Sequence, residues 1–174
     1  PIHVGMYGNE VLVLEEKDFD IIAPSILPAA GVVLCGRNET RQKYTDFIRY
    51  NLLHKHSIMP EYGEKLICRA NDWRLESGGI NLTNGLTGRL MNQPDPTSFD
   101  GKCFYIDFMP DLSSIPFRHV PVDYTFFSAN LEKKKDMKAF NYIYGEAFEY
   151  GYCQTVYTAQ GSQWNCGVYF EEYM

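Results

Sequence analysis

Arg37 and Arg41 stand four positions apart just after a short apolar run. The run, residues 31–36, has the continuous apolar pattern of a buried parallel strand, and a helix start follows it. Guanidinium groups bind phosphate oxygens through paired hydrogen bonds, and a helix start favours anions. The spacing therefore predicts that these arginines bind phosphate. Surface arginines that cap a helix are the simpler alternative.

Residues 148–164 form the second segment that could do chemistry. The segment opens as a strand, with Phe148, Tyr150 and Tyr152 on one face, and then turns polar around Gly161. Ligands of α/β sheets bind beyond the carboxyl ends of the strands, and a glycine lets backbone N–H groups approach an anion closely. The pattern predicts a strand, a turn and a short helix start that face a nucleotide. The same three elements without a ligand are the alternative.

A helix and two buried strands are expected to position these segments. Apolar residues recur at helical spacing from Tyr44 to Leu52, so residues 39–53 are expected to form an amphipathic helix with Asn38 as its N-cap. The strands at 31–36 and 148–156 are expected to share one sheet. Residues 167–170 are expected to form a further strand, and residues 2–31 an irregular lead-in with one strand.

The middle of the chain has a different pattern. Residues 64–128 contain short alternating runs separated by Gly, Asn, Asp and Pro, which is typical of a small antiparallel barrel. Trp73 in this region is either a core residue or a platform on which bases stack. Residues 131–140, with four lysines, are expected to be a solvated connection, and contact with a DNA backbone is the lesser alternative.

Composition sets further bounds. The chain has 174 residues, 45% of them hydrophobic, and a net charge of −6, so any contact with nucleic acid has to be local. Five cysteines lack the paired spacing of a zinc site, and Cys35, Cys68 and Cys153 lie in apolar runs, which favours buried thiols. No apolar run is long enough to cross a bilayer, and we expect a cytoplasmic protein without a membrane partner.

The segment 148–164 resembles motif V of superfamily 1 helicases, especially the RecD-like and phage Dda-like branch. The matching residues are Thr155, Gln160, Gly161, Ser162 and Trp164. Tyr157 stands where the family usually has His, and Gln163 where it often has Glu. Residues 32–41 resemble motif IV of the same branch. Residues 64–90 resemble its inserted Src-homology-3-like barrel, on Arg69, Asn71, Trp73, Leu82, Asn84, Gly85 and Gly88.

The resemblance implies an α/β fold: the second RecA-like motor domain, of the P-loop NTPase type, with an inserted antiparallel β-barrel. Residues 1–63 would begin the motor domain, residues 64–128 would form the barrel, and residues 129–174 would return to the motor domain. The phosphate loop does not occur in the sequence. The resemblance therefore implies a fragment whose N-terminal RecA-like domain lies outside this chain, and the fragment alone is expected to be inactive.

The implied activity is that of an ATP-dependent DNA helicase or RecD-like exodeoxyribonuclease subunit in DNA repair and recombination. It couples ATP hydrolysis to movement along single-stranded DNA and unwinding, with nuclease subunits as further partners. The implied roles are catalysis by Arg41 and secondarily Arg37, nucleotide binding by Gly161, Gln160 and Gln163, and DNA binding by Thr155, Tyr157, Ser162 and Trp73. The missing domain is expected to bind ATP and Mg²⁺ mainly, and no metal ligand is expected here.

Two alternatives belong to other classes. The barrel could be a nucleic-acid- or peptide-binding module with no motor activity, which leaves the arginines after residue 36 unexplained. The opening residues Pro1-Ile-His-Val resemble tautomerases that use an N-terminal proline as a base, but the match is four residues long.

Overall fold

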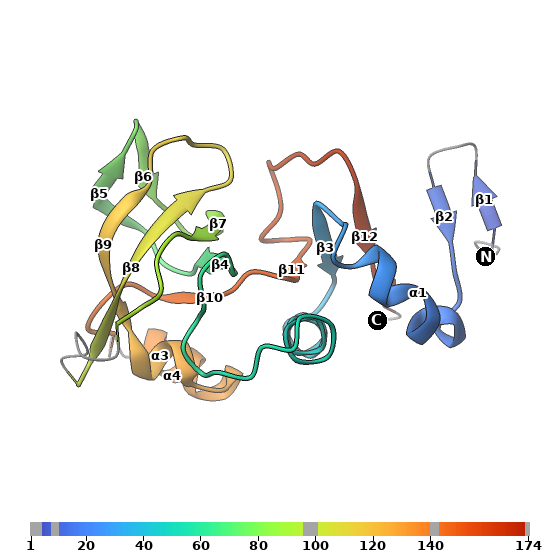
Figure 1. Cartoon of the computed structure of the whole chain (residues 1–174), viewed down its shortest axis with the longest axis horizontal. Coiled ribbons are helices and arrows are strands. Elements are labelled where there is room, and N and C mark those ends of the chain that lie inside the picture. Colours follow the sequence, from blue (N-terminus) through green and yellow to red (C-terminus); the bar gives the residue numbers. More distant parts are fainter. Residues whose placement is uncertain (1–4, 8–10, 96–100, 140–142, 173–174) are drawn as a thin grey trace.

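The computed structural model describes residues 5–7, 11–95, 101–139 and 143–172. Figure 1 shows three parts along the long axis of the chain. A group of antiparallel strands lies at one end, and a small parallel sheet with helix α2 (Asn38–Asp46) lies in the middle. A hairpin with helix α1 (Phe19–Ile26) lies at the other end. Pro1 and the proposed tautomerase feature lie outside the described residues.

The parallel sheet is built around β3 (Val32–Cys35). Strand β11 (Gln154–Thr155) pairs with one edge of β3 and β12 (Gly167–Tyr169) with the other, both in parallel. Helix α2 (Asn38–Asp46) follows β3 and continues as a π-helical segment, η2 (Phe47–Leu52). These findings confirm the strands predicted near 31–36 and 167–170 and the helix predicted over 39–53.

The core of this part combines residues from both ends of the chain. Tyr44 and Ile48 on the helical segment pack with Cys35 and Cys153, and the ring of Tyr44 stacks on Phe170 at 3.7 Å between centroids. Cys35, Cys68 and Cys153 are all buried, as the apolar runs predicted. The helical periodicity was informative here because one face of α2 and η2 covers the sheet.

The second sheet is antiparallel, with the strand order β10-β4-β7-β8-β9. Its strands are β4 (Lys65–Cys68), β7 (Thr87–Leu90), β8 (Cys103–Pro110), β9 (Phe117–Asp123) and β10 (Phe148–Tyr150). Strands β5 (Asp72–Ser77) and β6 (Ile80–Leu82) pair as a separate hairpin. The short antiparallel strands predicted for this region are confirmed. The described strands do not close into a barrel, so the barrel stays a prediction.

The expected single strand at 148–156 is wrong. The five-stranded sheet and the β5–β6 hairpin lie between β3 and β11 in the chain; we call the five-stranded sheet the inserted sheet, and the sheet and hairpin together the inserted unit. Phe148–Tyr150 pairs antiparallel with β4 in the inserted sheet, and only Gln154 and Thr155 pair with β3. Gly151 lies at the crossing between the two sheets, where its N–H donates to the carbonyl of Lys65 and an added Cβ would lie 2.9 Å from the backbone of Leu66. The alternating pattern was correct for strand character, but it does not specify which strand is the partner.

Helices join these parts. Helix α1 (Phe19–Ile26) follows a 3₁₀ turn, η1 (Glu16–Asp18), and the hairpin of β1 (Gly5–Tyr7) with β2 (Val11–Val13). The lead-in was not expected to contain a helix. Helices α3 (Tyr124–Ser128) and α4 (Leu131–Ala139) follow β9, and α4 contains the lysine run. Within the described ranges, none of the helices has the length and apolar character needed to cross a bilayer.

Candidate functional site

The carboxyl ends of β3 and β11 lie side by side. Thr155 is opposite Cys35 in the parallel register, and the next N–H, that of Val156, donates to the carbonyl of Cys35. The loop before α2 and the turn after β11 therefore leave the same edge of the sheet (Figure 1). This edge is where an α/β sheet binds ligands.

The loop after β3 binds a carboxylate. The Glu172 side chain accepts hydrogen bonds from the N–H groups of Gly36, at 2.6 Å, and Arg37, at 2.9 Å, and from the hydroxyl of Thr40. The Thr40 hydrogen bond, then those two N–H groups, holds the pKa of Glu172 below its usual value. Helix α2 begins at Asn38 and its N-cap residue is Arg37, so the expected N-cap role of Asn38 is wrong.

The turn after β11 exposes most of the residues singled out from the sequence. Gln160, Gly161, Ser162 and Gln163 are all exposed, and Gly161 has a φ of +84° with open space where a Cβ would be. The N–H of Ala159 donates to Thr155, and that of Ser162 to Ala159. The expected helix start after Gly161 is wrong: residues 156–161 form a turn, which leaves these polar groups facing outward.

Thr155 differs from its neighbours because it is buried. Its hydroxyl lies 2.9 Å from the Thr158 hydroxyl and accepts from the Thr158 N–H at 3.3 Å. These bonds hold the turn in place, so Thr155 acts as a positioning residue. Gly85 approaches the same turn from the inserted unit, since a Cβ on it would lie 3.4 Å from the carbonyl of Thr158. The inserted unit and the turn are therefore in contact.

Two of the residues singled out from the sequence are exposed aromatic side chains. Tyr157 in the turn is 83% exposed, and Trp73 on β5 is 69% exposed. Burying two such rings would be favourable, and nothing among the described residues covers them. Of the two roles open for Trp73, a core position is excluded by this exposure.

The two arginines have different surroundings. Arg37 is exposed at the end of β3, whereas Arg41 is 3% exposed and points to the inserted sheet. The Arg41 guanidinium donates through Nη1 to Glu149 at 2.9 Å and through Nε to the side chain of Asn38 at 3.3 Å. Arg41 therefore lies one turn into α2 and engages a carboxylate within the protein.

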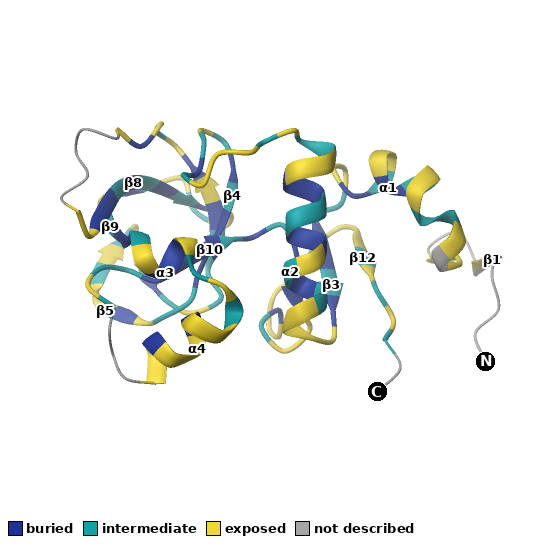
Figure 2. Cartoon of the chain, turned by 90° about the horizontal axis from the view of Figure 1, so that it is seen from below, coloured by how far each residue is buried: buried dark blue, intermediate teal, exposed yellow. Residues whose placement is uncertain are grey.

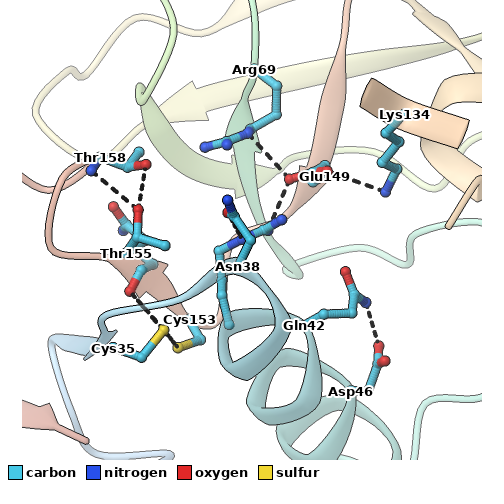
Figure 3. A network of polar contacts seen from close by, with 12 residues as sticks. Cys35, Asn38, Gln42, Asp46, Arg69, Lys134, Glu149, Cys153, Thr155 and Thr158 are labelled. Atoms are coloured by element: carbon cyan, nitrogen blue, oxygen red, sulfur yellow. Dashed lines mark hydrogen bonds and ion pairs between the residues drawn. The ribbon is translucent and has the colours of Figure 1, made fainter. Parts of the chain in front are cut away.

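Glu149 is the centre of a buried charge cluster, drawn in Figure 3. Besides Arg41, it contacts Nε of Arg69 at 3.2 Å and Nζ of Lys134 at 3.3 Å. Burial alone would raise the pKa of Glu149, but the three cations, Arg41 foremost, hold it below its usual value. Burial lowers the pKa of Lys134. We call these four residues the Glu149 cluster.

Sequence reasoning missed this cluster. The one local signal was an acidic residue flanked by Phe148 and Tyr150 in an otherwise apolar strand. Its partners come from α2, α4 and the position just after β4, so only the fold brings them together. No protein-family model matches this sequence, and no curated protein matches it either. The function must therefore be inferred from the chain's own residues.

Proposed function

We propose that this chain is the second RecA-like domain of an ATP-dependent DNA helicase of the RecD-like branch, carrying an inserted antiparallel unit. The observation that carries the proposal is the adjacency of two loops at one edge of the parallel sheet. One loop already accepts an anionic group through Gly36 and Arg37, and the other exposes Gln160 and Gly161. The inserted unit lies between them in the chain, as the resemblance requires.

ATP is the substrate in this proposal, and a first motor domain holds most of it together with Mg²⁺. The Glu172 carboxylate shows that the N–H groups of Gly36 and Arg37 fit an anionic oxygen. The exposed Arg37 guanidinium at this edge would stabilise charge that develops on the transferred phosphate. Gly161 would bring backbone N–H groups near the nucleotide, and Gln160 and Gln163 would donate to the ribose.

Arg41 takes a different part in this proposal. Its buried ion pair with Glu149 ties α2 to β10, and the chain runs from β10 through β11 to the turn at 156–161. Arg41 is thus a positioning residue for both loops, and Arg37 is the arginine that faces phosphate. The proposal predicts that substitutions at the two positions have different kinetic signatures.

Single-stranded DNA would bind with its bases stacked on the exposed aromatic side chains. Bases stack on aromatic rings regardless of sequence, and hydroxyl groups such as that of Ser162 bind phosphate oxygens. Tyr157 and Trp73 are the two exposed rings on the turn and on the inserted hairpin. The net charge of −6 makes a large phosphate contribution unfavourable, so stacking would supply most of the affinity.

The test is binding of a fluorescent oligothymidylate to the chain, measured by anisotropy at low salt. We expect Tyr157→Ala and Trp73→Ala each to weaken binding by about 5–150-fold, the equivalent of about 1–3 kcal/mol per stacked base. Tyr62→Ala is the matched control, because Tyr62 is 62% exposed and lies in the loop before β4. Equal affinities for all four proteins would contradict the proposal.

A binding module without motor activity is the second candidate, and the exposure of Trp73 favours it. In that case the β5–β6 hairpin acts alone and the turn has no part. The same titration separates the two, because a binding module loses affinity in Trp73→Ala and keeps it in Tyr157→Ala.

A further inference from the structure

A cleft lies between α2 and helices α3 and α4, lined by Gln42 and Asp46 on one side and by Ser128 and Lys135 on the other. Figure 2 labels these three helices. Its outer part has a volume of about 1020 Å³, and a smaller inner cavity of about 140 Å³ adjoins it. The two share the walls formed by Gln42, Asp46, Tyr50, Ser128 and Ala129. The inner cavity therefore opens onto the outer cleft and is not isolated in the core.

The inner cavity is lined by charged groups of the Glu149 cluster. Arg41, Lys134 and Glu149 all contribute to its wall, and each is less than one-tenth exposed. Glu149 pairs with three cations, since Arg69 also contacts it, and it is the one carboxylate paired with them in the part of the chain that the structure describes. Asp46 adds a second negative charge at the wall, where it accepts from the side chain of Gln42. The wall thus carries two cations and two carboxylates, and the positive excess comes from Arg69, which contacts Glu149 but does not line the cavity.

This positive excess is buried, which is costly unless another group compensates it. Charged groups removed from water need partners close by. The Lys134 ammonium has three donors, of which the contact at 3.3 Å to Glu149 satisfies one. An anion in the cavity would balance the excess positive charge and accept hydrogen bonds from Lys134.

Thr45 supplies an independent sign of a ligand. The residue is 2% exposed, lines the inner cavity, and its hydroxyl has no hydrogen-bond partner among the described residues. A threonine in a helix commonly donates to the carbonyl one turn earlier, but this one does not. Buried hydroxyl groups are rarely left unsatisfied, so a donor facing this cavity indicates an acceptor inside it.

We propose that the inner cavity binds a phosphate group, whose oxygens accept hydrogen bonds from Lys134, Arg41 and the Thr45 hydroxyl. Thr45 lies seven residues into α2, about two helical turns from the loop at the end of β3. The inner cavity is therefore distinct from the strand-end loops, whereas the outer cleft reaches one of them, since Gly36 and Arg37 line it. Phosphate binding in the inner cavity does not depend on the proposed helicase function. Inorganic phosphate and the phosphate of a nucleotide share this chemistry. The outer cleft, with the ring of Tyr50 in its wall, has room for a nucleoside.

Isothermal titration calorimetry of the 174-residue chain tests this proposal. The titrants are inorganic phosphate, adenosine 5′-monophosphate and adenosine, in chloride buffer at constant ionic strength. We expect saturable binding of phosphate and none of adenosine. Tighter binding of the monophosphate than of phosphate would identify a nucleotide site, and the reverse order would identify a site for the free ion. Absence of saturable binding for both phosphate compounds would overturn the proposal.

Matched variants locate the binding. Thr45→Val keeps the shape of the side chain and removes the hydroxyl, and Lys134→Met removes one cation. Each should weaken phosphate binding by about tenfold or more, as expected for a hydrogen bond to a charged group. Thr45→Ser restores the hydroxyl and should bind like the parent. Lys133→Met is the control, because Lys133 is exposed on the same helix. Unchanged affinity in folded Thr45→Val would show that phosphate binds elsewhere.

Discussion

Glu149→Gln should be among the most destabilising single substitutions in this chain. Glu149 is 6% exposed and contacts three cations at 2.9, 3.2 and 3.3 Å. Glutamine has nearly the same shape, so packing is kept while the carboxylate that pairs with Arg41, Arg69 and Lys134 is removed. Breaking a buried ion pair on one side costs about 3–5 kcal/mol. That is a large part of the 5–15 kcal/mol by which domains are typically stable.

Urea denaturation followed by circular dichroism measures this cost, as a lower midpoint at constant slope. The variant should also become more stable as pH rises toward the pKa of lysine. Burial lowers the pKa of Lys134 in the folded state, so the unfolded chain binds more protons and stability increases with pH. Loss of the Glu149 carboxylate lowers the pKa of Lys134 further, so the increase of stability with pH becomes steeper.

A surface pair provides the control for the same chemical change. Glu15 pairs with Lys17 at 2.5 Å, but their side chains are 48% and 72% exposed. Glu15→Gln should therefore alter the free energy of unfolding by less than about 1 kcal/mol. Equal urea midpoints for Glu149→Gln and Glu15→Gln would refute the stabilising role of the Glu149 cluster.

Two further predictions concern pH and backbone packing. Burial, and then the neighbouring Asp72, raise the pKa of Glu146 to about 7, so the folded state holds a proton that the unfolded state releases near 4.5. Stability should fall by about 1–3 kcal/mol as pH rises from 4.5 through 7, and Glu146→Gln should remove this slope in urea titrations at several pH values. Gly151→Ala places a Cβ 2.9 Å from the backbone of Leu66, so its melting temperature should fall, corresponding to about 1–3 kcal/mol. A parent-like melting curve for Gly151→Ala would show that the crossing between the sheets accommodates a Cβ without a steric clash.

Local patterns were sufficient for β3, which is buried on both faces, and for α2, which buries one face. The apolar run before Arg37 and the helical spacing after it specified β3 and α2, because both pack against a neighbouring layer. Helix α1 was missed because Pro24 and Pro28 suggested a break. Pro24 lies inside the helix, and Phe19, Ala23 and Leu27 at four-residue spacing pack into the core of the parallel sheet.

Partner choice could not be predicted from local patterns. Phe148–Tyr150 has strand character, but its pairing with β4 depends on Gly151, which lets the chain cross between sheets. Arg41 was assigned to phosphate from its place in the first helical turn, and its direction depends on Glu149, more than one hundred residues later. The exposed Gln160 and Gly161 could be predicted, because a polar turn after a buried strand faces solvent.

The most direct test of the central claim is ATP turnover by the intact motor protein with single-stranded DNA present. Arg37→Ala should lower kcat by about 10³-fold or more with little change in KM, as for arginines that stabilise transferred phosphate. Arg41→Ala should instead lower the melting temperature and affect turnover through that loss of stability. The 174-residue chain alone should not hydrolyse ATP. Parent-like turnover in Arg37→Ala, or turnover that DNA does not stimulate, would contradict the assignment of this chain to a DNA motor.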